Sequence, residues 1–328
     1  MMNQDFMLYL LLPWALTLVA FTFIMLYVVK GLSRFPLFHA KNYADKTVYY
    51  GLGFVWLPWG ALVLALGYVN VLTVASLLEM PHDTHIYKIL SQLLFPFSHN
   101  FLILAVPLAI LCFFFGLLDD MFSEHDESGF KGHISALIRG KITTGMGKLL
   151  GIGIVSLGVS MLYFVSSSYR IGYIAIDSMP LGLLVGYSVL GGLAIALTAN
   201  LLNLTDLRPA RASKVYLVLL LIAVIIAPEN MAVIALLALP IMATWSLDAG
   251  EKAMLGDAGV NPAGAVMGLY FVHIISAEPL AWVWLMLYVT IMFLLNLASE
   301  KISFSAVIER NKLLKMLDMI GRPKPPTD

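Results

Sequence analysis

The sequence predicts an all-α polytopic integral membrane protein with about nine transmembrane helices, and three observations support this fold class. Of its 328 residues, 60% are hydrophobic and only 12% are charged, whereas a soluble domain has about 25% charged residues. Its apolar residues gather in stretches of roughly 20, the length that crosses a bilayer as a helix. Its basic residues are confined almost entirely to alternate connecting segments, as in multi-pass membrane proteins.

Nine stretches are long and apolar enough to be interpreted as spans. They cover residues 6–29, 53–78, 101–118, 149–167, 181–199, 214–227, 230–246, 262–276 and 279–298. The first has no basic leader, so we expect a retained helix rather than a cleaved signal. Turn signals at Ala227-Pro228-Glu229-Asn230 and Ala277-Glu278-Pro279 separate the last four spans. We expect Trp56, Trp59, Trp282 and Trp284 to anchor span ends at the membrane interface.

The distribution of Lys and Arg predicts the orientation. If the N-terminus is outside, one side of the membrane holds segments 30–52, 119–148, 200–213, 247–261 and 299–328. With Lys214 counted at the edge of segment 200–213, that side then carries 18 of the 20 basic residues, all except Lys88 and Arg170. Such a bias marks the cytoplasmic side, so the C-terminal tail, 299–328, is expected in the cytoplasm. The net charge is zero, and we expect no nucleic-acid partner.

Three of these cytoplasmic segments carry carboxylates in distinctive settings. Asp119 and Asp120 end the third span in "FGLLDDMF", where the partial negative charge of a helix end disfavours them unless a cation is bound. The plainer alternative is a solvated helix end.

The second setting is "NLLNLTDLRPARAS", residues 200–213. Asn200, Asn203 and Asp206 follow one another at i+3 steps and share one arc of a helix, a pattern that suits a polar ligand. The alternative is helix-end capping, which Asn and Asp also favour. Arg208 and Arg211 follow directly and are candidates for binding the diphosphate of a donor or an acidic group on its sugar. The alternative is that both only pair with lipid headgroups.

The third setting is "MLGDAGVNPAG". Asn261-Pro262 predicts the start of the eighth span, which places Asp257 in a glycine-flanked loop just before a helix N-terminus. A carboxylate there can hold a metal. The alternative is a simple turn, with Gly264 and Gly268 serving as a small-residue packing face.

Together these sites predict a centre for a hard cation. Carboxylates and amides, without cysteine or paired histidine, select Mg²⁺ or Mn²⁺, with Asp120 and Asp257 as the expected ligands. Mg²⁺ commonly acts on substrate phosphates, so the expected chemistry is phosphoryl transfer at the inner leaflet.

Four motifs in order resemble a known family. The order "LLDD", "GKLLG", "NLLNLTD" and "LGDAG", over roughly residues 100 to 270, is similar to the polyprenyl-phosphate N-acetylhexosamine-1-phosphate transferases. This superfamily includes phospho-N-acetylmuramoyl-pentapeptide transferase. The resemblance implies transfer of a sugar-1-phosphate from a UDP-sugar to a polyprenyl phosphate in the plasma membrane, with Mg²⁺ and release of UMP. It also implies a single transmembrane catalytic domain, 1–298, and a product used for cell-envelope polysaccharide.

The resemblance also implies roles for individual residues. Asp119 and Asp120 resemble the family's aspartate pair, and Lys148 its phosphate-binding lysine. Asn203 and Asp206 resemble its nucleotide and metal loop, and Asp257 its Mg²⁺ ligand. These matches imply that Asp119, Asp120 and Asp257 are the catalytic residues. The sequence departs from the family at Asp206-Leu207-Arg208-Pro209-Ala210-Arg211, where relatives repeat Asp-Gly, and it lacks an evident histidine-rich sugar loop near the C-terminus.

Other functions stay open at this point. "DLRPAR" has the skeleton of the CDP-alcohol phosphotransferase motif, although the downstream aspartates of that motif are absent. A transporter would place polar residues near the bilayer midplane rather than at span ends. A relative that only binds the lipid carrier is compatible with the altered loops, and a homodimer is compatible with the sequence. The expected partners are polyprenyl phosphate, a nucleotide-sugar donor and membrane lipids.

Overall fold

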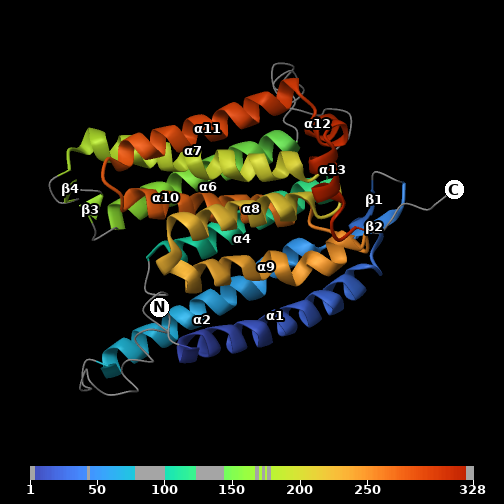
Figure 1. Ribbon diagram of the computed structural model, residues 1–328, viewed down its shortest axis with the longest axis horizontal. Coiled ribbons are helices and arrows are strands. Elements are labelled where there is room, and N and C mark those ends of the chain that lie inside the picture. The colour runs from blue at the N-terminus through green and yellow to red at the C-terminus, as the bar shows by residue number, and fades with distance from the viewer. Residues whose placement is uncertain are drawn as a thin grey trace.

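A computed structural model of the chain describes residues 4–42, 45–77, 100–122, 144–166, 170–171, 174–175 and 179–322. Long helices run side by side in one bundle, with their ends gathered at two faces (Figure 1). In the described residues these helices are α1 (Gln4–Leu32), α2 (Trp56–Leu77), α4 (Asn100–Phe122), α6 (Thr144–Ser166), α7 (Leu181–Thr205), α8 (Arg211–Ile226), α9 (Met231–Ala249), α10 (Gly256–Ser276) and α11 (Ala281–Lys301). Each coincides with one of the nine predicted spans.

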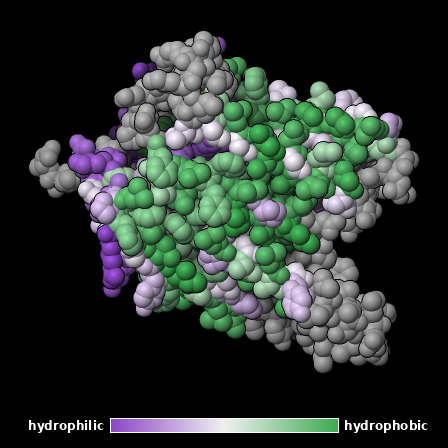
Figure 2. Space-filling model, turned by 180° about the vertical axis from the view of Figure 1, so that it is seen from behind, coloured by the Kyte–Doolittle hydropathy of each residue, from purple (hydrophilic) through white to green (hydrophobic). Residues whose placement is uncertain are grey.

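Eight of these helices are long and apolar enough to cross a membrane, which confirms an all-α polytopic membrane protein. The exception is α8, whose 16 residues make it about 24 Å long, shorter than the roughly 30 Å of a hydrocarbon core. Apolar side chains cover the flanks of the bundle, while hydrophilic residues gather at one end (Figure 2). The lipid would contact these flanks.

The helix α10 lies at the centre of the bundle. It is buried along 18 of its 21 residues and packs mainly against α4 and α7. Side chains at Gly264 and Gly268 would collide with the backbone of α7, 2.5 Å from the Cα of Ala199 and 2.8 Å from that of Ile195. These two glycines therefore form a small-residue packing face, which lets α10 and α7 approach closely.

Two small sheets lie at opposite ends of the bundle (Figure 1). At the end with the hydrophilic residues, β1 (His39–Lys41) pairs antiparallel with β2 (Thr47–Tyr50), and β2 pairs parallel with β5 (Ala253–Met254). At the other end, β3 (Arg170–Ile171) pairs with β4 (Ile174–Ala175). Short 3₁₀ turns are η1 (Pro36–Phe38), η2 (Leu52–Val55) and η5 (Pro228–Asn230).

The helices extend beyond several predicted boundaries. We expected the eighth span to begin at Pro262, but α10 begins at Gly256, so Asp257 lies in its first turn rather than in a loop. Asn261 is buried inside the helix instead of capping it. The reason is that a helix end can be closed by a distant side chain, here one from α4, which local sequence signals do not reveal.

Two of the four expected interfacial tryptophans are instead buried anchors. Trp56 and Trp59 have no exposed surface, and their indole N–H groups donate to the carbonyl oxygens of Gly259 and Leu236, each at 3.0 Å. Trp282 and Trp284 are exposed, as expected of residues at a membrane surface.

The C-terminal tail is partly helical. It contains α12 (Phe304–Arg310) and α13 (Lys312–Met319), which lie at the same end of the bundle as β1 and β2 (Figure 1). Ser303 and Asn311 cap the two helices with their side chains.

Candidate active site at one end of the bundle

Three helices bring one lysine and three aspartates together at the end of the bundle that carries the β1–β2–β5 sheet. The ammonium of Lys148, in the first turns of α6, lies 2.7 Å from Oδ2 of Asp119 near the end of α4. It also contacts the carboxylate of Asp257 in the first turn of α10. The side chains of Lys148 and Asp119 are almost fully buried. One cation therefore bridges two carboxylates that are distant in sequence.

Asp120 has a different environment from its neighbour Asp119. Its Oδ1 accepts the backbone N–H of Asp257 and its Oδ2 that of Ala258, both at 2.9 Å. Its charge also lies at the positive end of the α10 dipole. Asp120 therefore closes the N-terminus of α10, and each of its oxygens keeps a second lone pair for a ligand.

Two glycines make this close approach feasible. Gly256 has φ +59°, in the left-handed region, and a Cβ there would lie 2.7 Å from Oδ2 of Asp120. A Cβ on Gly116, one turn earlier in α4, would lie 2.2 Å from the carbonyl oxygen of Asp257. The glycine of "LGDAG" and the glycine before "LLDD" are thus required by the same helix contact.

Tyr50 adds a group that sequence reasoning missed. It ends β2, is half-buried, and lies against Gly256. Burial raises the pKa of Tyr50 well above its usual range, and the charges of the aspartates at 120, 257, 206 and 119 raise it further. The charges of these four predicted aspartates therefore all act on one phenol. No local signal could have found it, because the pairing of β2 with β5 joins segments about 200 residues apart.

Asp206 belongs to the same site, at its edge. It follows the last residue of α7 and is half-buried. Burial raises the pKa of Asp206 well above its usual range, followed by the charges of Asp248 and Asp257. Asp248, at the end of α9, accepts a 3.1 Å hydrogen bond from Ser213 and was not singled out from the sequence. A cavity of about 110 Å³ lies beside Asp206, and Arg208, Lys41 and Glu251 also line it.

The structure does not place Asn200 and Asn203 together beside Lys148. The amide of Asn200 donates to Asn296 of α11 at 2.6 Å, and Asn296 in turn donates to the carbonyl of Leu197 at 3.0 Å. Asn200 thus joins α7 to α11 as a packing contact. Asn203 is half-buried one turn further on, and its carbonyl accepts the N–H of Asp206.

The two arginines of the Asp206–Arg211 turn contact the C-terminal tail. Arg211 is 3% exposed and donates two hydrogen bonds, at 2.8 and 3.0 Å, to the carboxylate of Asp318. It donates a third, at 2.7 Å, to Ser305. Arg208 lies 3.8 Å from Glu309 in a more exposed ion pair. Arg211 therefore holds the tail in this structure.

The donor atoms of the site fit a hard divalent cation. They are carboxylate oxygens, and Oδ1 of Asp119 is buried with no hydrogen-bond partner among the described residues. An ammonium already bridges Asp119 and Asp257, so the site binds positive charge. Within the part of the chain that is described, no three His, Cys, Asp or Glu side chains form a ready-made metal cluster.

In comparisons with known proteins, no protein-family model and no curated protein matches this chain. Its function is therefore inferred from the chemistry of the site.

Proposed function

We propose that this protein transfers a sugar-1-phosphate, of the N-acetylhexosamine-1-phosphate type, from a UDP-sugar to a polyprenyl phosphate. The observation that carries this proposal is the meeting of Lys148, Asp119, Asp120 and Asp257 at one end of the bundle. Three of the four motifs on which the family resemblance depends supply these residues, and the fourth supplies Asp206 beside them.

In the reaction, an oxygen of the acceptor phosphate attacks the phosphorus that bears the sugar. The bond from that phosphorus to the bridging oxygen breaks, and UMP leaves with the bridging oxygen and its electron pair. Such a transfer depends on positioning and charge neutralisation more than on covalent protein chemistry. Lys148 supplies a nearly buried positive charge for phosphate oxygens once its carboxylate partners turn to other ligands.

Asp257 and Asp119 would hold Mg²⁺ or Mn²⁺, together with the remaining lone pairs of Asp120. Asp120 has the further task of fixing the start of α10, and therefore the position of Asp257. A bound Mg²⁺ or Mn²⁺ would neutralise phosphate charge and make the phosphorus more electrophilic. Arg208 lines the cavity beside Asp206, whereas Arg211 donates to Asp318 in the tail. These contacts favour Arg208 over Arg211 as the arginine that contacts the donor.

The membrane side of the site is part of the proposal. The described parts of segments 30–52, 200–213 and 247–261 and the helices α12 and α13 lie at one end of the bundle (Figure 1), and they carry most of the described basic residues. Lys148, which contacts Asp119 and Asp257, belongs to the site at this same end. The positive-inside rule then makes this end cytoplasmic, where nucleotide sugars are available. A reporter fused after Asp328 should be active in the cytoplasm, and activity only outside the membrane would contradict this topology.

The function is tested with purified protein, a polyprenyl phosphate and a panel of nucleotide sugars. The expected result is metal-dependent release of UMP together with a polyprenyl-diphospho-sugar, lost in Asp257→Asn. Release of CMP from a CDP-alcohol would instead favour the CDP-alcohol phosphotransferase class. Binding of the polyprenyl phosphate without any product would indicate a protein that only binds the lipid carrier.

A matched control is available at the same end of the molecule. Asp45 is highly exposed in the β1–β2 turn and has φ +58°, a conformation that asparagine tolerates well. Asp45→Asn makes the same chemical change as Asp257→Asn but should leave UMP release unchanged.

A further inference from the structure

The helix α13 is amphipathic, but its apolar side does not face the protein, in contrast to a surface helix of a soluble protein. Lys312, Lys315 and Asp318 follow at three-residue steps and share one side of the helix. The opposite side is apolar and consists of Leu313, Leu314, Met316, Leu317 and Ile320. A helix on a water-soluble domain turns its apolar side toward the protein.

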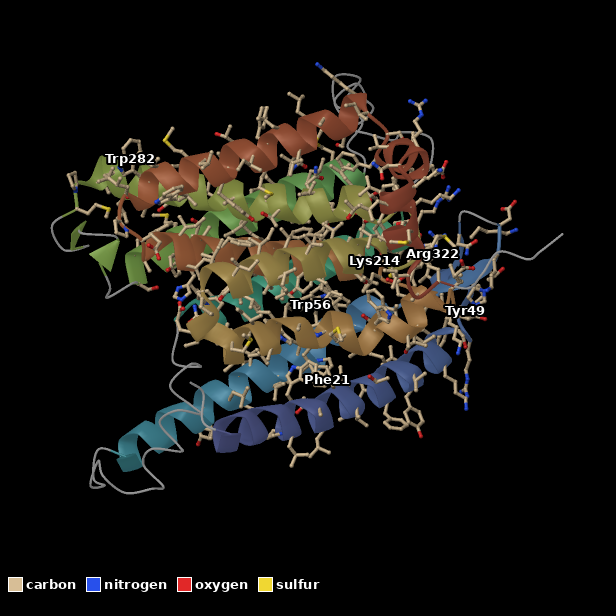
Figure 3. The ribbon with its side chains drawn as sticks, viewed as in Figure 1. Phe21, Tyr49, Trp56, Lys214, Trp282 and Arg322 are labelled. Carbon is tan, nitrogen blue, oxygen red and sulfur yellow. The ribbon has the colours of Figure 1, made fainter. Side chains whose placement is uncertain are left out.

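Here the C-terminal end of the polar side, at Asp318, contacts the protein, whereas Lys312 and Lys315 are exposed. Asp318 receives Arg211 from α8, and Arg322 donates to the same carboxylate at 2.9 Å. The ammonium of Lys214 contacts the carbonyl oxygen of Asp318. Figure 3 shows Lys214 and Arg322 close together at this end of the bundle. The bonds of Asp318 thus fix which side of α13 faces the protein.

The apolar side of α13 therefore points away from the protein. Leu313 is 60% exposed, Met316 is 59% exposed and Ile320 is 54% exposed. Contiguous apolar surface of this kind is unfavourable in water and marks a contact with another apolar phase.

The position of α13 on the bundle identifies that phase. On α8, Lys214 shares one face with Val218, Leu221 and Ile225, at steps of four, seven and eleven residues. These three apolar residues are exposed on the flank of the bundle, so this face of α8 points toward lipid. Lys214 lies at one end of that face, and its ammonium contacts the carbonyl oxygen of Asp318 in α13. The helix α13 therefore lies at the rim of the bundle, where the lipid surface begins.

The charges indicate the kind of lipid. Besides the residues that bind Asp318, the described tail exposes four basic residues, Lys301, Arg310, Lys312 and Lys315, and one acidic residue, Glu309. Each basic residue close to an anionic membrane surface contributes about 1 kcal/mol of attraction. Only two residues, 302 and 303, separate the spanning helix α11 from α12, which keeps the tail near the membrane.

We propose that α13 is an interfacial helix that binds the anionic surface of the membrane in which the protein is embedded. Its apolar side enters the headgroup region beside α8, Lys312 and Lys315 contact anionic headgroups, and Asp318 links the helix to Arg211. Such helices bury their apolar side roughly 5–10 Å into the boundary between headgroups and acyl chains. This membrane contact does not depend on the proposed transferase activity.

The test places a fluorescent label on the full-length protein in nanodiscs of phosphatidylcholine and phosphatidylglycerol. Cys112 is fully buried, and Cys112→Ala gives a background without thiols. A label at Met316→Cys is compared with one at Ile225→Cys, on the lipid-facing side of α8, and one at Lys41→Cys, on the exposed strand β1. Brominated acyl chains quench a label in lipid, and aqueous iodide quenches a label in water.

The expected result is quenching at position 316 by brominated lipid to a degree similar to position 225. Iodide quenching there should be at least about threefold weaker than at position 41, as for a helix in the interface. Iodide quenching equal to that at position 41 would overturn the proposal. Protection from both quenchers would also overturn it, because a second copy or another protein would then cover the helix.

A charge variant tests the choice of lipid. Lys312→Glu with Lys315→Glu should weaken quenching by brominated lipid in nanodiscs that contain phosphatidylglycerol, and should change it little in phosphatidylcholine alone. An equal response in both compositions would overturn the anionic part of the proposal. Neither measurement involves UMP release, so the outcome is independent of whether the transferase proposal holds.

Discussion

The carboxylate of Asp120 accepts the backbone N–H of Asp257 at 2.9 Å, although the two residues are 137 positions apart. One aspartate of the site therefore fixes the position of another. Asp120 acts on the backbone of α10, whereas the side chain of Asp257 contacts Lys148. This division leads to different expected effects when each is changed.

Asp120→Asn should lower both stability and activity. An amide offers one acceptor oxygen where the carboxylate offers two, so one N–H at the start of α10 is left without a partner. Loss of such a buried hydrogen bond costs about 1–3 kcal/mol. Thermal unfolding in detergent measures this loss, and an unchanged transition temperature would contradict the role of Asp120 in closing α10.

Asp257→Asn should mainly reduce catalysis. Loss of a metal ligand removes transition-state stabilisation worth on the order of 10³-fold in rate. UMP release is the measurement, with Asp45→Asn as the control. Near-normal turnover in folded Asp257→Asn protein would remove the support for a metal centre.

Lys148→Gln should make stability depend on a divalent cation. Without the ammonium, the carboxylates of Asp119 and Asp257 lie close together with no positive charge between them. A cation that binds there stabilises the folded state, by about 2.7 kcal/mol at a hundredfold excess over its dissociation constant. Unfolding is measured with Mg²⁺ and with chelator. The increase in unfolding temperature caused by Mg²⁺ should be larger in Lys148→Gln than in the wild type. The control is Lys252→Gln, which changes an exposed lysine at the same end of the bundle. Equal increases in all three proteins would count against the site.

Gly256→Ala should destabilise the protein. A left-handed conformation and a 2.7 Å approach to Asp120 both oppose a Cβ at this position. A strained backbone residue costs about 1–3 kcal/mol. Gly67→Ala is the matched control, because that glycine lies within α2 with nothing within 4 Å of a new Cβ. There the substitution should be neutral or stabilising, and equal effects of the two would contradict the close contact at Gly256.

The contact between Arg211 and Asp318 should persist over the physiological pH range and fail in acid. Partial burial alone would raise the pKa of Asp318, but the hydrogen bonds and charge of Arg211 outweigh it and hold the pKa below its usual range. For a lowered pKa, the stabilisation is fully present above the unfolded value, about 3.9, and is lost as pH falls through the folded value. Hydrogen exchange of residues 312–319 should therefore show constant protection from about pH 5 to 8.

Asp318→Asn should release the tail at neutral pH. Arg211 then loses its charged partner, and protection of residues 312–319 should fall by about 1–3 kcal/mol. Glu309→Gln is the control, because the exposed pair of Glu309 with Arg208 contributes at most about 1 kcal/mol. A tail that stays protected in Asp318→Asn would show that other contacts hold it.

The sequence by itself determined the membrane class, the approximate helices and four charged residues that the structure brings together. Apolar stretches of span length can form little other than helices in a bilayer, because every backbone polar group needs a partner there. Charged residues are costly among such stretches, so Asp119, Asp120, Lys148 and Asp257 were conspicuous at the ends of spans. Their convergence agrees with the prediction that they share one membrane face.

The tertiary structure alone decided which polar groups of one motif serve the site and which serve packing. Asn200 and Asp206 were expected on one arc of a helix, yet Asn200 lies in α7 and binds Asn296 of α11, while Asp206 follows that helix and feels the charges of Asp248 and Asp257. The same holds for Trp56 and for Arg211, whose partners lie on α10 and α13. Helical periodicity fixes the direction of a side chain relative to its own helix, whereas its partner depends on which distant helix packs there.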